Sequence, residues 1–149
     1  MGNALFYHLT RSPAESLLSV LIGKSLAAGW RVELRGTDPA RMDHLDRHLW
    51  QGDGFLPHGL AGGPHDARQP VLLTVAGQPA PNDSACLMAL DGVEVSPEEI
   101  QRLQRACIIF DGGDSAATAR ARDQWKALTG AGVTAEYWSE ESGRWERKR

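Results

Sequence analysis

Short apolar runs of strand length alternate with longer amphipathic segments along most of this chain. The apolar runs, which predict β-strands, are residues 4–9, 30–34, 71–76, 85–90, 106–110 and 134–138. The amphipathic segments, where apolar residues recur at helical spacing, are residues 12–28, 38–50, 96–105 and 114–129. This alternation of helices and strands predicts an α/β sandwich with a mixed or mostly parallel sheet.

Helix-start and helix-stop signals mark where these elements begin and end. Residues 12–15 and 96–99 both match the capping box, in which a serine and an acid three residues later satisfy the first backbone N–H groups of a helix. Gly29 and Gly130 are predicted to end the first and last helices. Turn residues between 76 and 85 predict that the two flanking strands form a pair.

The sequence predicts one domain over residues 1–149, because this length allows a substantial core and shows no repeat. Residues 51–70 are rich in glycine and proline and predict a long loop. Long loops in compact domains usually carry function, so this segment is a candidate for a binding surface.

Composition argues against several classes of function. The chain has 16 Lys and Arg against 19 Asp and Glu, and its net charge of −3 argues against a general nucleic-acid-binding protein. No apolar stretch approaches the roughly 20 residues that a membrane span needs. Cys86 and Cys107 lie in apolar strand-like runs, and buried free thiols fit a reducing compartment. We therefore expect a cytoplasmic protein that does not contact the membrane.

Candidate catalytic and metal-binding residues are few and poorly placed. Gly23-Lys24-Ser25 resembles the end of a phosphate-binding loop, but it lies inside a predicted helix and Leu18 stands where the motif needs glycine. His44 and His48 share a helix face, but the spacing fixes no third ligand. We therefore expect no catalytic residue, no metal and no cofactor.

Asp111 and Asp114 keep one enzymatic alternative open, because they follow a predicted strand where α/β enzymes place ligands. A nucleotide- or metal-binding enzyme would use such carboxylates. The interpretation that we favour is local: Gly112 and Gly113 form a turn, and Asp114 or the next residue caps the following helix.

A cluster of large apolar residues in and beside the long loop offers a first candidate for a protein interface. Its members are Trp50, Phe55, Leu56 and Leu60. Aromatic anchors on adaptable loops are typical of binding hot spots, but the same residues would also serve as a lid folded over the core. The residues alone do not decide between the two.

The last long helix offers a second candidate. Arg122, Trp125 and Lys126 lie at i, i+3 and i+4 and therefore share one face. The core-facing side of this helix comprises Ala117, Ala121, Gln124 and Leu128. Two cations beside a large aromatic suit an acidic peptide with an apolar anchor, although the pattern alone favours a half-buried aromatic flanked by solvated charges.

The charged end of the chain, residues 139–149, raises direct DNA binding as a third class of function. Its basic residues and aromatic are Arg144, Trp145, Arg147, Lys148 and Arg149. Glu140 and Glu141 precede them, so we expect a frayed and solvated end instead.

The order and content of these segments resemble the chi subunit family of the bacterial DNA polymerase III holoenzyme over nearly the full length. The most specific match is Phe55-Leu56-Pro57-His58-Gly59-Leu60-Ala61-Gly62, which is similar to the family's F-x-P-H-x-L-A-G signature. Further matches are Phe6-Tyr7-x-Leu9, Gly29-x-Arg31-Val32, Leu49-Trp50, Trp125-Lys126, Gly132 and Trp138.

This resemblance implies a Rossmann-like three-layer fold and a non-catalytic accessory subunit in DNA replication. It implies two partners, the psi subunit of the clamp loader and the acidic C-terminal tail of single-stranded DNA-binding protein, with DNA reached only indirectly. By position, the tail-binding residues would be Arg122, Trp125 and Lys126, with Arg120 as a substitute for a basic residue that the family has at Thr118. The psi interface would comprise Trp50, Phe55, Leu56 and Pro57.

Overall fold

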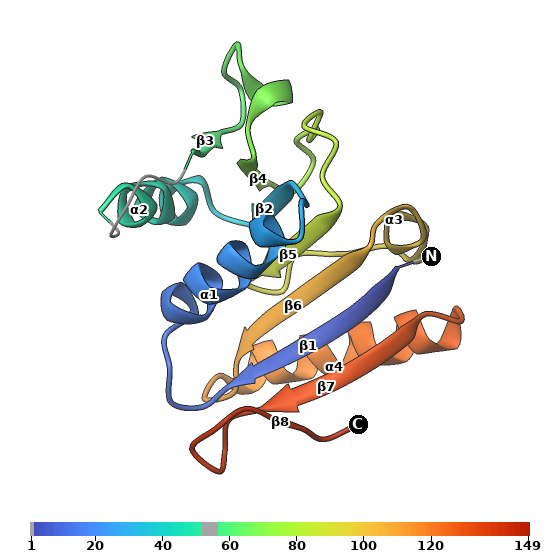
Figure 1. Cartoon of the computed structure of the whole chain (residues 1–149). Helices are drawn as coiled ribbons and strands as arrows, with labels where there is room; N and C mark the ends of the chain where they lie inside the picture. Colours follow the sequence, from blue (N-terminus) through green and yellow to red (C-terminus); the bar gives the residue numbers. More distant parts are fainter. Residues whose placement is uncertain (1, 52–56) are drawn as a thin grey trace.

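The computed structural model describes residues 2–51 and 57–149 (Figure 1). The strands are β1 (Asn3–Leu9), β2 (Val32–Gly36), β3 (Gly59–Leu60), β4 (Val71–Val75), β5 (Cys86–Leu90), β6 (Arg105–Asp111), β7 (Thr134–Ser139) and β8 (Glu146–Arg147). The helices are α1 (Ala14–Ala27), α2 (Pro39–Trp50), α3 (Pro97–Arg102) and α4 (Ser115–Gly130), with a 3-10 turn at Asp66–Arg68. Each element predicted from the apolar pattern is present, shifted by a few residues at its ends.

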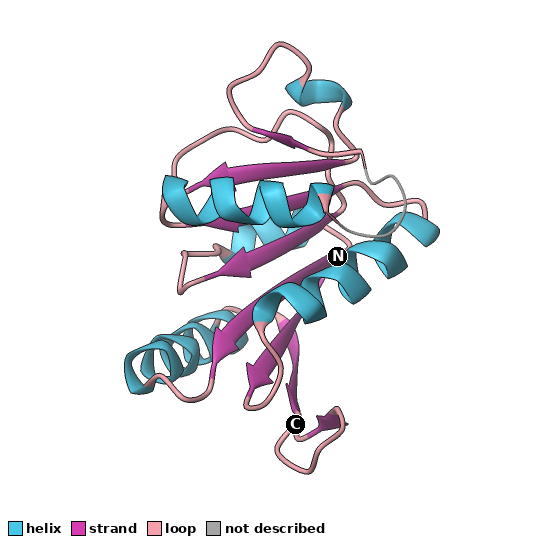
Figure 2. Ribbon diagram, turned by 90° about the vertical axis from the view of Figure 1, so that its left-hand side faces the viewer, coloured by secondary structure: helices cyan, strands magenta, loops and turns pink. Residues whose placement is uncertain are grey.

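In the described part of the chain, the strands form one sheet with the order β3-β4-β2-β5-β6-β1-β7-β8. Neighbouring strands run parallel except for β7 and β8, which are antiparallel. Helices α1 and α2 cover one face of the sheet, and α3 and α4 cover the other (Figures 1 and 2). The predicted three-layer α/β sandwich with a mostly parallel sheet is confirmed.

The predicted pairing of β4 with β5 is wrong. Strand β2 lies between them and is parallel to both, with Leu34 opposite Leu73 on one side and Met88 on the other. The loop that joins β4 to β5 contains Asn82. The buried side-chain amide of Asn82 holds this loop against β2, since it donates to the backbone oxygens of Val32 and Gln69 at 3.1 and 3.0 Å. Strands buried on both faces form continuous apolar runs, so their sequences do not reveal which strands are neighbours.

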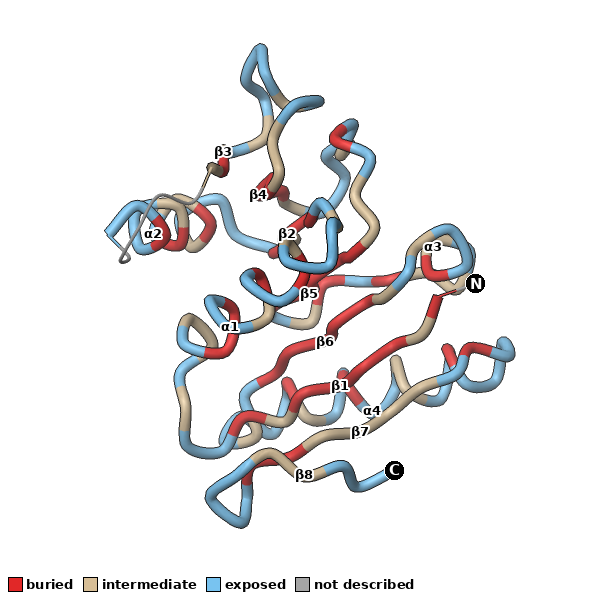
Figure 3. The backbone as a smooth tube through the Cα atoms, in the orientation of Figure 1, coloured by how far each residue is buried: buried red, intermediate tan, exposed pale blue. Residues whose placement is uncertain are grey.

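Side-chain alternation along the strands divides the core into two parts. Tyr7 and Leu34 face α1 and α2, whereas Phe6 and Ile108 face α3 and α4. The central strands β5, β6 and β1 are almost entirely buried, while β7, next to the short outermost strand β8, is mostly half-buried (Figure 3). This exposed flank of the sheet, next to α4, is where a surface pocket forms.

The helix ends follow the predictions in part. Gly29 has φ of 83° after α1, as expected for a residue that ends a helix in the left-handed region. Beyond α4, however, the left-handed residue is Gly132, with φ of 90°, and Gly130 is still helical. The capping box at residues 96–99 is confirmed, since the Ser96 side chain accepts from the Glu99 N–H and the Glu99 carboxylate accepts from the Ser96 N–H.

The last residues of the chain, 139–149, are called the C-terminal segment below. The prediction that they form a frayed end is wrong, because β8 pairs with β7 and Trp145 packs edge-to-face on Tyr7 with ring centroids 5.6 Å apart. Trp145 is half-buried against the core that α1 and α2 cover. The segment is therefore part of the folded domain.

Cys86 and Cys107 are both free and buried, as predicted. Across residues 2–51 and 57–149, none of the helices combines the length and the apolar character that crossing a bilayer would require.

Candidate partner-binding site

The two acids that precede α4 have local structural roles. Asp114 caps the helix, since its carboxylate accepts from the N–H groups of Ala116 and Ala117 at 2.9 and 3.2 Å. The Asp111 carboxylate accepts from the Gly113 N–H at 2.8 Å, which closes the turn. The local interpretation of Asp111 and Asp114 as turn and cap is therefore confirmed.

The outer face of α4 and the edge of the sheet enclose a pocket of about 380 Å³, called the α4 pocket below. It is lined by Phe110, Thr118, Ala121, Arg122, Trp125, Lys126, Tyr137, Lys148 and Arg149. The structure thus brings Arg122, Trp125 and Lys126 together, as their helical spacing predicted. Tyr137, Lys148 and Arg149 join them from β7 and the C-terminal segment, and sequence reasoning missed this.

Aromatic rings form the floor and walls of the α4 pocket. Trp125 lies edge-to-face with Phe6 below it, at 5.2 Å between ring centroids, and with Tyr137 beside it, at 6.1 Å. The Tyr137 hydroxyl is hydrogen-bonded to His8 Nδ1 at 2.6 Å, which fixes the orientation of its ring. Burial raises the pKa of the Tyr137 hydroxyl, so this wall stays neutral. A preformed aromatic wall suits an apolar group.

Four cationic side chains surround these rings: Arg122, Lys126, Lys148 and Arg149. All four residues are exposed, so their charged groups are available to a ligand. Lys148 makes one long ion pair, 3.8 Å from the Glu146 carboxylate. Among the described residues, no Asp or Glu lines the α4 pocket. Positive charge is therefore concentrated locally on a protein whose net charge is −3.

Arg120 does not line the α4 pocket. Its guanidinium packs over the backbone of Gly92, in the space that a Cβ at this position would need. Thr118 does line the pocket, and its hydroxyl donates to the Asp114 carbonyl at 3.0 Å. The structure therefore separates Arg120 from the other residues of the predicted tail-binding set.

A second pocket, of about 800 Å³, lies at the carboxyl ends of β1, β5 and β6, where α/β proteins place ligands. Its charged lining residues are Arg11, Glu15, Arg41, Asp91, Asp111, Asp114 and Arg120. Arg41 is paired within it with Asp91 at 2.8 Å and with Glu15 at 3.4 Å. The lining therefore holds both signs of charge, unlike that of the α4 pocket.

The backbone corner between β1 and α1 is occupied by the protein's own carboxylate. Glu140 accepts from the N–H groups of Thr10, Arg11 and Ser12 at 3.0, 2.7 and 2.6 Å, and from the Ser12 hydroxyl at 2.9 Å. The predicted capping box at residues 12–15 is therefore wrong: the Ser12 side chain is bonded to Glu140, and α1 has no side-chain cap. Nucleotide-binding folds commonly use this corner for phosphate, and here it holds a carboxylate.

The proposed psi-facing residues are only partly within the described structure. Trp50 ends α2 with 53% of its surface exposed, and its ring lies 4.3 Å from that of His58. Pro57 is half-buried, and Phe55 and Leu56 lie outside the described residues. Leu60, on β3, is 38% exposed, so large apolar side chains are exposed at this edge of the sheet.

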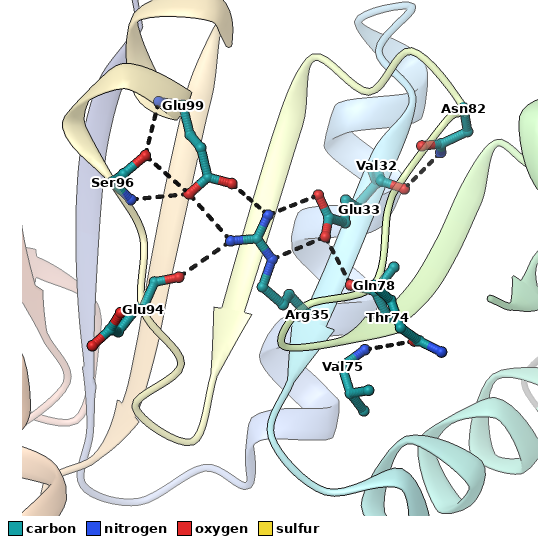
Figure 4. A network of polar contacts seen from close by, with 10 residues as sticks. All are labelled: Val32, Glu33, Arg35, Thr74, Val75, Gln78, Asn82, Glu94, Ser96 and Glu99. Atoms are coloured by element: carbon teal, nitrogen blue, oxygen red, sulfur yellow. Dashed lines mark hydrogen bonds and ion pairs between the residues drawn. The ribbon is translucent and has the colours of Figure 1, made fainter. Parts of the chain in front are cut away.

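A polar network lies on the α3-covered face of the sheet, away from both surfaces (Figure 4). Arg35 on β2 forms ion pairs with Glu33 at 2.9 Å and with Glu99 of α3 at 2.6 Å. Its guanidinium also donates to the Glu94 carbonyl, and Thr74 donates to Glu33 at 2.7 Å. Burial lowers the pKa of Arg35, but its hydrogen bonds to Glu99 and Glu33 outweigh this and raise that pKa overall. The network is a structural link between β2 and α3.

Within the described part of the chain, His, Cys, Asp and Glu side chains do not gather in groups of three or more that could hold a metal ion. The fold is that of a three-layer α/β protein, and its α4 pocket combines aromatic and cationic side chains. The model of the DNA polymerase III chi subunit family, HolC, matches residues 1–136, and the chain belongs to this family. No curated protein sequence matches the chain. Family membership gives the protein an accessory role in DNA replication.

Proposed function

We propose that the protein is a non-catalytic linker in the replication complex. It binds the psi subunit of the clamp loader and the acidic C-terminal tail of single-stranded DNA-binding protein, and it reaches DNA only through these partners. The observation that carries the proposal is the α4 pocket, in which cations surround aromatic walls. Such a pocket matches a tail that is acidic and ends in an apolar ring with a free carboxylate.

The chemistry of recognition follows from the side chains. Arg122 offers a planar fork that matches a carboxylate, and Lys126 acts as a point charge for the acidic residues of the tail. The terminal ring of the tail would lie against Trp125 and Tyr137, a contact worth about 1 kcal/mol beyond simple burial. Exposed ion pairs contribute roughly 0–1 kcal/mol each, so the affinity should be modest and should fall with salt.

Titration calorimetry with an acidic tail peptide tests this site. Arg122→Ala should weaken binding several-fold and flatten its salt dependence, and Trp125→Ala should weaken it most for a peptide that keeps its terminal aromatic residue. Arg102→Ala, which removes an exposed cation from α3, is the charge-matched control. Arg120→Ala tests whether Arg120 belongs to the site, as the sequence resemblance implies, or lies outside it, as the structure has it. Because Arg120 lines the other pocket, this variant should bind the peptide normally. Unchanged affinity in the Arg122 variant would contradict the assignment.

Psi would bind at the opposite edge of the sheet, through Trp50 with Phe55, Leu56 and Pro57. The support is the exposure of Trp50, since a large aromatic side chain that is 53% exposed is a typical anchor. Trp50→Ala should reduce co-purification with psi while the melting temperature changes little. Val20→Ala is the matched control, because Val20 is 52% exposed but lies on α1. Full co-purification of the Trp50 variant would rule out this surface.

The buried free thiols Cys86 and Cys107 support a reducing, cytoplasmic location for this linker. The alternative of a nucleotide-binding enzyme has a direct test in thermal shift. We expect no rise in melting temperature with nucleotides and divalent metals, because Asp111 and Asp114 already accept hydrogen bonds from the backbone. Stabilisation by a nucleotide, without any response to the tail peptide, would favour the enzyme instead.

A further inference from the structure

The C-terminal segment reaches the α4 pocket from outside the part of the chain that the family model matches. The match ends at residue 136, whereas Tyr137, Lys148 and Arg149 all line the pocket. Two of the four cations in the lining therefore come from the C-terminal segment and two from α4. The family features alone account for only one side of this pocket.

Backbone hydrogen bonds set the position of the last residues beside Tyr137. The Lys148 N–H donates to the Tyr137 carbonyl at 2.6 Å, and the Tyr137 N–H donates to the Arg149 carbonyl at 3.2 Å. Because β7 and β8 are antiparallel neighbours, this pairing places Lys148 and Arg149 next to the aromatic wall of the pocket.

Two anchors, the buried Glu140 and the half-buried Trp145, hold the segment at its start and its middle. Glu140 is 5% exposed, and its carboxylate accepts three backbone N–H groups and the Ser12 hydroxyl from the corner after β1. Trp145 packs against Tyr7 in the core on the other face of the sheet. The segment therefore turns around the edge of the sheet, with its anchors on one side and its cations on the other.

We propose that the C-terminal segment is part of the tail-binding site, in which Glu140 and Trp145 hold Lys148 and Arg149 over the α4 pocket as its second pair of cations. This inference rests on the proposed function of the pocket. It assigns Lys148 and Arg149 a direct contact with the acidic residues of the tail, and Glu140 a positioning role.

The charge contribution is tested by calorimetry with the acidic tail peptide. The double variant Lys148→Ala/Arg149→Ala should raise the Kd by about three- to tenfold at low salt, since each exposed ion pair changes the affinity by a small factor. The control Lys24→Ala/Arg102→Ala also removes one exposed lysine and one exposed arginine, but neither residue lines the α4 pocket or lies in the C-terminal segment, and its affinity should stay close to that of the unaltered protein.

The positioning role is tested with Glu140→Ala, which leaves the corner after β1 without its acceptor. Hydrogen exchange at the Lys148 amide should become faster and the Kd for the peptide should rise. In the Lys148/Arg149 variant only the Kd should change. If Glu140→Ala does not fold, Glu140→Gln replaces it, because the amide keeps one acceptor oxygen. The Lys148 amide of Glu140→Gln should also exchange faster than in the unaltered protein.

The outcomes separate this inference from the function on which it rests. If the unaltered protein binds the peptide and Arg122→Ala weakens binding, but the Lys148/Arg149 variant binds as tightly as its control, the segment has no part in recognition. If Glu140→Ala accelerates exchange at Lys148 without changing the Kd, the positioning role is wrong. If the unaltered protein does not bind the peptide, the proposed function itself fails.

Discussion

Glu140 joins two distant parts of the chain at a single carboxylate. Its partners, Thr10 to Ser12, lie about 130 residues away in sequence, as the separations of 128 to 130 show. These N–H groups lie in the corner before α1, whereas the Ser12 side chain was expected to accept from the first turn of the helix itself. A phosphate could bind at these groups only by displacing this carboxylate, which argues against a nucleotide site at this corner.

The Glu140 carboxylate should make stability depend on pH. Burial raises the pKa of this carboxyl, but the hydrogen bonds from Ser12, Arg11 and Thr10 outweigh it, so its pKa in the folded protein lies below the ordinary value of 4.5. The stabilisation is therefore complete above pH 4.5 and is lost as the pH falls through the folded-state pKa. Urea unfolding of Glu140→Gln at several pH values measures this directly.

At neutral pH the Glu140→Gln variant should be less stable than the unaltered protein by about 1–3 kcal/mol, the usual value for hydrogen bonds to a charged group. The difference in unfolding free energy should shrink as the pH is lowered below 4.5. Glu98→Gln, which neutralises an exposed acid on α3, provides the control. A difference that stays constant down to low pH would show that ionisation of Glu140 is not what stabilises the corner.

At the scale of elements, α3 depends on its surroundings because it has only six residues. Isolated helices of this length are unstable in water. The capping box, the buried Ile100 and the ion pair between Glu99 and Arg35 hold it in place (Figure 4). Arg35 thereby connects α3 to β2, and it also compensates the charge of Glu33, which is 5% exposed.

Removing Arg35 should therefore be costly, because the Glu33 charge would remain buried without a cation. Arg35→Met should lower the free energy of unfolding by about 3–5 kcal/mol. The double variant Glu33→Gln/Arg35→Met should recover part of this loss, since a neutral amide can still accept the Thr74 hydrogen bond. Chemical denaturation of both variants gives the comparison. A double variant that is less stable than the single one would show that charge burial is not the cause.

Elements were predictable where their signals are local. The capping box at residues 96–99 was predictable because both partners lie within one turn of helix. The one at residues 12–15 was not, because the Ser12 hydroxyl donates instead to the Glu140 carboxylate, which is distant in sequence. The parallel order of β4, β2 and β5 was not predictable, because their apolar runs specify burial but not neighbours. Gln124, a polar residue on the core-facing side of α4, donates to the Val93 carbonyl at 2.9 Å, a bond that the helical pattern alone does not indicate.

In the α4 pocket, too, the residues brought together by local geometry were predictable and those placed by distant contacts were not. Helical geometry predicted that Arg122, Trp125 and Lys126 share a face, and all three line it. Tyr137 could have been found from the alternation in β7, since it shares a face with Ala135 toward α4. Lys148 and Arg149 could not, because their position depends on Glu140 and Trp145 contacting residues at the other end of the chain.

At the scale of the whole molecule, the two proposed surfaces lie at opposite edges of the sheet. Trp50 lies against His58, next to β3, whereas the α4 pocket is lined by Tyr137 of β7 and by residues 148 and 149 after β8. Strands β3 and β8 are at the two ends of the sheet (Figure 1). Buried strands of the sheet separate the two surfaces. Both partners should therefore bind at the same time without competing.

If the two surfaces are separate, binding of psi and binding of the tail peptide should be independent, and this can be measured. The affinity for the acidic tail peptide should be the same, within about 0.5 kcal/mol, whether or not psi is bound, as is usual for sites that share no residues. Trp50→Ala should leave peptide binding unchanged, and Arg122→Ala should leave psi binding unchanged. A large change in either cross-measurement would mean that the two surfaces are coupled or overlap.

The shortness of the outermost strands has a consequence for solubility. The sheet ends at β3 on one side and β8 on the other, each only two residues long. A long exposed edge strand offers unpaired backbone groups that another chain can extend into an aggregate. Two such short edges leave little room for that addition. Side-chain surfaces rather than strand edges should therefore determine what associates with the domain.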